Sequence, residues 1–118
     1  MKLYGISNCS TVKKARDWLA QHEIAVDFHD FKKHGLEAAT VQRWLKQNDW
    51  SKLVNRNGMT WRALPDERKQ QVCDSSSAAL LMLEKNSVIK RPLLEHNDTL
   101  LHVGFDVSAY SKIFNFPS

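Results

Sequence analysis

The chain has 118 residues, a formal net charge of +4 and a hydrophobic fraction of 42%, values typical of one globular domain. Two cysteines are too few to staple a secreted scaffold, and the His and Cys spacing predicts no metal site. The longest apolar run, residues 78–83, is too short to span a membrane, and the N-terminus has no signal-peptide core. The densest basic segments are pairs, which favours no nucleic-acid partner. We expect a single cytoplasmic domain, 1–118, that is monomeric and binds no membrane.

The first third of the chain reads as strand, helix, strand. Residues 2–6 form an apolar strand that runs into a turn, and residues 26–31 alternate as a second strand. Between them, Ser10 or Thr11 is a suitable N-cap for a helix. The apolar face of that helix is Val12, Ala15, Trp18 and Leu19. This βαβ order predicts two parallel strands with a right-handed crossover.

The middle of the chain is predicted to be a helical insert of about residues 36–86. Helices are expected after Gly35, from Pro65 to about Cys73, and from an Asp74–Ser77 cap through Glu84. Breaks are expected at residues 48–51 and 55–58, which are rich in Asn and Asp.

The last third returns to strands. Two apolar runs, 93–95 and 100–103, flank an Asn-Asp turn and predict an antiparallel hairpin. Asp106 is a suitable cap for a final helix. The apolar face of this helix is Val107, Tyr110, Ile113 and Phe114. The whole order matches an α/β fold of thioredoxin-like (glutaredoxin-like) architecture, with a four-stranded mixed sheet and a helical insert.

Cys9 is the strongest candidate for chemistry. It lies in the turn between the first strand and the first helix, where unpaired N–H groups and the helix dipole favour a thiolate. Lys13, one turn further on, adds positive charge. A thiolate is the nucleophilic form of cysteine, so this position indicates a redox or nucleophilic role. The alternative is a small buried residue at a turn.

The residues around Cys9 define what else the site needs. The motif reads Cys-Ser-Thr-Val, so a resolving thiol would come from elsewhere, most simply from glutathione. Cys73 is the internal alternative, and we interpret it as a bystander on a helix face. Asn8 and Thr11 flank Cys9 and either donate to the sulfur or cap the turn.

Arg91-Pro92 forms the second part of the candidate site. Pro92 stands just before the third strand, where thioredoxin-like folds place a cis-proline beside the nucleophilic cysteine. Arg91 would then project near Cys9, where a guanidinium can hold a carboxylate or an oxyanion and stabilise a thiolate. The alternative is a surface arginine.

Three segments, 5–15, 57–62 and 89–94, together resemble the arsenate reductase/Spx family, most closely its YffB-like branch. The resemblance extends to Gly104-Phe105 and covers nearly the whole chain. It implies a thioredoxin-like fold, with Cys9 as the redox cysteine and Arg91 as the residue before a cis-proline. On resemblance alone, Trp61 also belongs near the site.

The chain departs from the family pattern at two cationic positions. Glutaredoxin-coupled arsenate reductases of the family surround the cysteine with three arginines, of which only Arg91 matches cleanly. Asn55 occupies the second position, with Arg56 one residue later, and Gly104 occupies the third. Fewer charge-assisted hydrogen bonds should weaken arsenate binding. Spx-type regulators often carry a Cys-x-x-Cys motif, which this chain does not.

These observations predict a glutathione-dependent thiol reductase of the arsenate reductase family, with Cys9 and Arg91 as catalytic residues. The expected substrate-binding residues are Asn8, Ser10, Thr11, Lys13, Arg56, Trp61 and Pro92. We expect no bound cofactor, glutathione or another small thiol as co-substrate, and glutaredoxin as a further candidate partner. The alternatives are a glutaredoxin-coupled arsenate reductase and a non-enzymatic Spx-like regulator that binds RNA polymerase.

Overall fold

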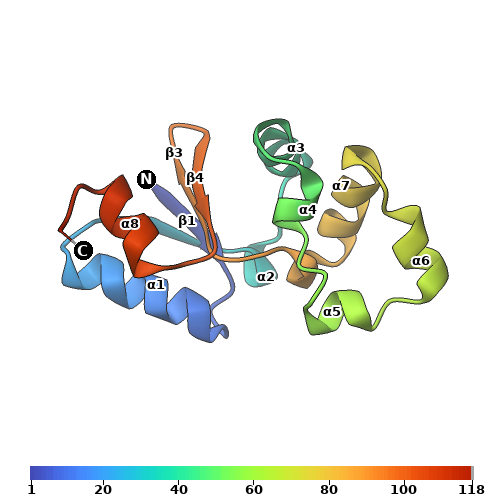
Figure 1. Ribbon diagram of the computed structural model, residues 1–118, viewed down its shortest axis with the longest axis horizontal. Coiled ribbons are helices and arrows are strands. Elements are labelled where there is room, and N and C mark those ends of the chain that lie inside the picture. The colour runs from blue at the N-terminus through green and yellow to red at the C-terminus, as the bar shows by residue number, and fades with distance from the viewer. Residues whose placement is uncertain (118) are drawn as a thin grey trace. The chain divides into compact units, whose positions relative to one another are not determined.

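The computed structural model describes residues 1–117 and divides the chain into two compact units (Figure 1). The first unit combines Met1–His34 with Arg91–Ser118, and the second is Gly35–Lys90. The interpretation of the whole chain as one domain with an insert at about residues 36–86 stays a prediction.

The first unit is built on a four-stranded sheet in the order β2-β1-β3-β4. The strands are β1 (Lys2–Gly5), β2 (Asp27–Asp30), β3 (Leu93–His96) and β4 (Thr99–Val103). β1 runs parallel to β2 and antiparallel to β3, and β3 pairs antiparallel with β4. This mixed sheet confirms the predicted βαβ unit, the hairpin and the thioredoxin-like architecture.

Two helices, α1 (Ser10–Gln21) and α8 (Val107–Ile113), pack on this sheet through an apolar cluster. The short α2 (Phe31–His34) directly follows β2. The cluster consists of Leu3, Ala15, Trp18, Leu19, Leu94 and Tyr110. Burial of each large apolar side chain contributes about 1.5–3 kcal/mol, so this cluster fixes α1 against β1 and β3.

Several local predictions for the first unit need correction. Cys9, and not Ser10 or Thr11, is the N-cap of α1, because the helix already begins at Ser10. The second strand is shorter than 26–31, since Phe31 opens α2. Val107 is 52% exposed and does not belong to the buried face of α8. The predicted cap of α8 is confirmed, because the Asp106 carboxylate accepts a hydrogen bond from the Ala109 N–H at 2.7 Å.

The second unit is helical. Its helices are α3 (Ala38–Gln47), α4 (Trp50–Leu53), α5 (Met59–Arg62), α6 (Asp66–Gln71), α7 (Ser75–Glu84) and the 3₁₀ turn η1 (Asn86–Val88). Its buried side chains include Val41, Trp44, Leu53, Leu81, Met82 and Ile89. The N-cap of α7, predicted to lie within Asp74–Ser77, is Asp74, which forms a capping box with Ser77.

The short helices of the second unit are where the sequence-based predictions fail. A break is predicted at residues 48–51, but α4 begins there, at Trp50. The Asp49 carboxylate accepts a hydrogen bond from the Ser51 N–H and so caps this single helical turn. α6 ends at Gln71, so Cys73 lies in the loop before α7 and not on a helix face. Such one-turn helices carry too little periodicity to be recognised from a pattern.

Candidate active site

Cys9 stands where the chain leaves β1 and enters α1. It is the N-cap of the helix, in an extended conformation with φ −147° and ψ 123°, and its carbonyl accepts a hydrogen bond from the Lys13 N–H at 3.0 Å. Its side chain is partly exposed. The sulfur therefore lies beside the first N–H groups of α1, which have no partner within the helix.

Gly5 allows α1 to begin this close to the sheet. A Cβ added to Gly5 would lie 2.9 Å from one methyl group of Val12 and 3.0 Å from the other. Val12 is fully buried, so it cannot move aside into solvent. A glycine at the end of β1 thus brings the first turn of α1, and with it Cys9, against the sheet edge.

The surroundings of Cys9 favour the thiolate. Partial burial alone raises the pKa of the thiol, but the Val12 N–H, the Arg91 guanidinium and the Thr11 N–H stabilise the negative sulfur. Together these contacts hold the pKa of Cys9 below its ordinary value. A partly exposed thiol with a lowered pKa is the arrangement of a reactive cysteine.

Arg91 reaches Cys9 from the start of β3. The Arg91–Pro92 peptide bond is cis, and the Pro92 carbonyl accepts a hydrogen bond from the Gly104 N–H at 2.8 Å. Tyr4 near the end of β1 pairs with Leu93 at the start of β3, so the residues before β3 meet the residues after β1. This antiparallel pairing is what brings Arg91 to the sulfur.

The other residues predicted for the site fall into two groups. Asn8, Ser10 and Lys13 lie near Cys9 along the chain and are exposed. The Lys13 ammonium pairs with Asp17 at 2.9 Å on the surface of α1.

Two further predicted site residues belong to the second unit. The Arg56 guanidinium lies over the ring of Trp50, 5.2 Å from its centroid. Trp61 is a partly exposed residue of α5. Their roles in substrate binding stay predictions.

Sequence reasoning missed Asp30 and Ser7. The Asp30 carboxylate accepts hydrogen bonds from both the backbone N–H and the hydroxyl of Ser7, two residues before Cys9. Asp30 ends β2 directly opposite Gly5 at the end of β1. The parallel pairing of the two strands predicts that their carboxyl ends meet at one sheet edge, but the bond to Ser7 follows only from the register of β1 and β2.

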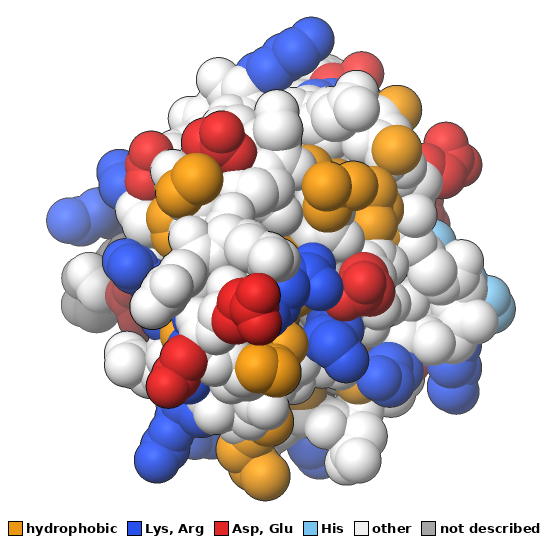
Figure 2. All heavy atoms as spheres, turned by 90° about the vertical axis from the view of Figure 1, so that its right-hand side faces the viewer, with side chains coloured by type: hydrophobic (Ala, Val, Ile, Leu, Met, Phe, Trp, Pro, Cys, Tyr) orange, Lys and Arg blue, Asp and Glu red, His pale blue; other side chains and the backbone are white. Residues whose placement is uncertain are grey.

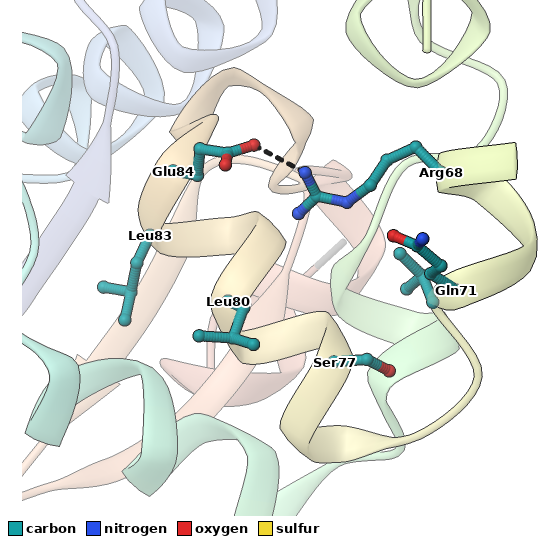
Figure 3. Close-up of a pocket in the computed structure, with 7 residues that line it drawn as sticks. Arg68, Gln71, Ser77, Leu80, Leu83 and Glu84 are labelled. Atoms are coloured by element: carbon teal, nitrogen blue, oxygen red, sulfur yellow. Dashed lines mark hydrogen bonds and ion pairs between the residues drawn. The ribbon is translucent and has the colours of Figure 1, made fainter. Parts of the chain in front are cut away.

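A separate hollow in the second unit offers no comparable chemistry. It is lined by Arg68, Gln71, Val72, Ser77, Leu80, Leu83 and Glu84. Figure 3 shows the two leucines on α7 and the ion pair between Arg68 and Glu84, whose N–O distance is 2.8 Å. Because its two charged groups neutralise each other and the Ser77 hydroxyl is engaged in the capping box of α7, we do not regard it as a reaction centre.

The surface in the view of Figure 2 is mixed in charge, with Lys and Arg interspersed among Asp and Glu and with scattered apolar patches.

Within residues 1–117, no cluster of three or more His, Cys, Asp or Glu side chains is arranged to hold a metal ion. In the same range, no helix combines the length and apolarity needed to cross a membrane.

Comparison with known proteins finds relatives that match nearly the whole chain. The sequence matches the ArsC family over residues 4–113. An uncharacterized protein of Haemophilus influenzae is 38% identical over 112 residues, which cover 95% of this chain and 96% of the relative. The solved structure of a YFFB protein is 42% identical with a TM-score of 0.88, covering 94% of this chain and 96% of its own. An arsenate reductase (ArsC) related protein from Brucella melitensis is 47% identical with a TM-score of 0.77, covering 98% of this chain and 94% of its own.

Proposed function

Because the chain belongs to the ArsC family, we propose that it is a thiol-dependent reductase in which Cys9 is the nucleophile and glutathione is the reducing thiol. The observation that carries this proposal is the partly exposed Cys9 at the start of α1, held by the side chain of Arg91 from the start of β3. Membership of the family supports thiol chemistry in general. The identity of the nucleophile and of the co-substrate is our own inference.

The reaction we propose proceeds by two thiol–disulfide exchanges. In the first, the Cys9 thiolate attacks the glutathione sulfur of a mixed disulfide, forms a Cys9–glutathione disulfide and releases the substrate thiolate, which takes up a proton. In the second, a glutathione thiolate attacks the glutathione sulfur bound to Cys9, and Cys9 leaves as a thiolate. The substrate mixed disulfide is reduced to a thiol, and one glutathione thiol is consumed, leaving as glutathione disulfide together with the glutathionyl group that came from the substrate.

The lowered pKa of Cys9 assists both exchanges. In the first it increases the fraction of thiolate available for attack, and in the second it makes Cys9 a better leaving group. Arg91 assists in a second way, because a guanidinium can bind a carboxylate of glutathione through a bidentate pair of hydrogen bonds. The same side chain would thus hold the thiolate and orient its anionic partner.

The need for an external thiol follows from the position three residues after Cys9. A Cys-x-x-Cys motif would place a second thiol there, but this chain has Val12, whose side chain is fully buried. A mixed disulfide at Cys9 therefore has no resolving thiol within its own helix. Glutathione supplies one and also carries the carboxylates that suit Arg91.

Mass spectrometry after incubation with glutathione disulfide tests this proposal. We expect one added glutathionyl group on the native chain, located at Cys9 by peptide mapping and removed by reduced glutathione. The Cys73→Ser variant should retain the adduct, and the Cys9→Ser variant should lose it. An unmodified Cys9, or an adduct confined to Cys73, would overturn the proposal.

Arsenate reduction is a second candidate, favoured by the similarity to the arsenate reductase related protein from Brucella melitensis. Two features of this chain weaken it. The Asn55 side chain accepts a hydrogen bond from the Asn57 N–H at 3.1 Å and is engaged in its own loop. Gly104 has φ +86°, a conformation that disfavours the arginine this position would need.

A direct assay separates the two candidates. The protein is supplied with arsenate, glutathione and glutaredoxin, and arsenite formation is compared with the reduction of a glutathione mixed disulfide. We expect turnover of the mixed disulfide alone. Arsenite formation that disappears in the Arg91→Ala variant would favour the second candidate instead.

A further inference from the structure

The Asp30 carboxylate connects two backbone segments at the edge of the sheet. Its side chain belongs to a residue that is 6% exposed. One carboxylate oxygen accepts hydrogen bonds from the hydroxyl and the N–H of Ser7, the latter at 3.1 Å. The other accepts from the N–H groups of Lys32 at 2.9 Å and Lys33 at 3.2 Å, at the start of α2. Both oxygens thus accept hydrogen bonds, one from Ser7 in the turn before α1 and the other from the backbone at the start of α2.

Ser7 occupies the turn that carries the nucleophile. β1 ends at Gly5 and α1 begins at Ser10, so the turn between them is short and Cys9 is its last residue. Ser7 itself is exposed, and neither its burial nor strand pairing holds it in place. The long-range bond to Asp30 is therefore a restraint on a segment that is otherwise at the surface.

The chemistry of Cys9 depends on where this turn places the sulfur. The thiolate is stabilised by the N–H groups of Val12 and Thr11 and by Arg91, contacts that act over hydrogen-bond distances. Reactive groups need positioning within about 0.5 Å, so a turn that drifts would lose these contacts. The Gly5–Val12 contact fixes the helix side of the turn, and the Asp30–Ser7 bond fixes its strand side.

We propose that Asp30 is a positioning residue for Cys9, which anchors the turn at Ser7 so that the sulfur stays at the start of α1 beside Arg91. This inference rests on the proposed function, because it assigns Asp30 a role in keeping the nucleophile active. Asp30 acts through Ser7 and through the backbone of the turn, and not on the substrate.

A role for Asp30 in proton transfer does not fit the site. Burial alone would raise the pKa of its carboxyl, but the bonds from Ser7, Lys33 and Lys32 lower it to about 2. The group is therefore ionised throughout the range in which a thiolate can form. The nearest cationic side chains along the chain, Lys32 and Lys33, are exposed and contribute to the carboxylate through their backbone N–H groups.

The test measures the alkylation rate of Cys9 against pH in a Cys73→Ser background. In Asp30→Asn we expect the thiol pKa to rise, which should slow alkylation near pH 7 by roughly threefold to tenfold, since a rise of about one pKa unit lowers the thiolate fraction by up to about tenfold. The matched control is Asp27→Asn, which removes the same charge from the exposed start of the same strand. Its profile should remain that of the parent.

The direction of the change separates positioning from charge. Removal of a nearby negative charge by itself would stabilise the thiolate and lower the pKa of Cys9, which is the opposite of the expected shift. Ser7→Ala supplies an independent arm, because it removes the hydroxyl bond without altering any charge. We expect Ser7→Ala to shift the profile in the same direction as Asp30→Asn, by less, since the backbone N–H of Ser7 still bonds to Asp30.

The outcomes also separate this inference from the proposed function. A raised pKa in both variants supports the positioning role. A parent protein with a lowered Cys9 pKa and unchanged profiles in Ser7→Ala and Asp30→Asn would overturn the positioning role alone, as would a lowered pKa in Asp30→Asn. A parent Cys9 that titrates like a free thiol would overturn the proposed function as well. If Asp30→Asn does not fold, Ser7→Ala decides the question.

Discussion

The two cysteines lie in turns that are held in different ways. The turn at Cys9 is tied to distant parts of the chain, by Asp30 on β2 and by Arg91 before β3. The loop at Cys73 is tied to its own neighbours, since the Cys73 N–H donates to the Ser77 hydroxyl at 3.0 Å, four residues along the chain. Cys9 is partly exposed, and Cys73 is exposed.

This difference shows how the fold controls the reactivity of a thiol. A local bond such as that at Cys73 closes the start of a helix and needs no other part of the fold. The Val12 and Thr11 N–H groups at Cys9 belong to its own helix, but Arg91 and the Asp30–Ser7 bond reach this turn only when β1, β2 and β3 are assembled. The reactivity of this thiol therefore depends in part on the tertiary structure. We therefore expect changes to distant residues to alter Cys9, and changes near Cys73 to leave Cys9 unaffected.

The largest expected effect comes from removing Arg91. Arg91→Ala loses a hydrogen bond and a positive charge that stabilise the Cys9 thiolate, so the pKa of the thiol should rise. Hydrogen bonds to charged groups contribute about 1.5–3 kcal/mol, which predicts an alkylation rate near pH 7 lower by roughly tenfold or more. Arg91→Lys, which keeps the charge but loses the planar fork, should lie between the two. Equal profiles for all three proteins would remove Arg91 from the site.

Asp30, which holds the turn at Cys9, makes the stability of the protein depend on pH in the acid range. The pKa of Asp30 is about 2 in the folded protein and about 3.9 in an unfolded chain, so its ionised form favours folding. This stabilisation is complete above about pH 5 and is lost as the pH falls from about 4 to about 2. Asp30→Asn should lower the free energy of unfolding by about 2–3 kcal/mol at neutral pH, and the difference from the parent should shrink across that window.

Urea denaturation at a series of pH values measures this difference. Asp27→Asn serves as the control, because that carboxylate lies at the exposed start of β2. A difference between Asp30→Asn and the parent that stays constant from pH 5 to about pH 2 would contradict the linkage.

Gly5→Ala tests the packing that seats the first turn of α1. The added methyl group would lie within 3.0 Å of Val12, and overpacking of this kind costs about 1–3 kcal/mol. We expect a lower urea midpoint together with a raised pKa of Cys9, because the turn must move to relieve the clash. A variant with the stability of the parent would show that Val12 has room to adjust.

The smallest effect is expected from a change in the loop at Cys73. Ser77→Ala removes the acceptor for the Cys73 N–H and one half of the capping box of α7. We expect the free energy of unfolding to fall by about 1 kcal/mol, measured by urea denaturation, with no change in the pH profile of Cys9. A shifted Cys9 profile would show that the two turns are coupled after all.

Local chemistry made much of the fold predictable. Asp106 caps the helix predicted to follow it, and Asp74 is the N-cap among the choices offered by residues 74–77, since an N-cap depends on residues two or three positions away. Asn97 and Asp98 both adopt positive φ, as a tight hairpin turn requires, and these residue types tolerate it. Cys9 and Arg91 could be singled out because their positions at strand ends follow from the order of elements.

What could not be predicted depends on contacts between distant segments. Ser10 and Thr11 are better N-caps than cysteine by propensity, yet the approach of Val12 to Gly5 starts the helix one residue earlier. Asp30 was assigned to a strand face, and nothing in its neighbours along the chain indicated a bond to Ser7. Its role appears once the register of β1 and β2 is known.

Gly104 has a consequence for anyone who would redesign the site. A Cβ at this position would meet no atom within 4 Å, so a larger side chain has space. The obstacle is the backbone, whose φ of +86° strains any residue other than glycine. An arginine at position 104, where arsenate reductases of the family carry their third arginine, would therefore require remodelling of the segment between β4 and α8. A single substitution would not suffice.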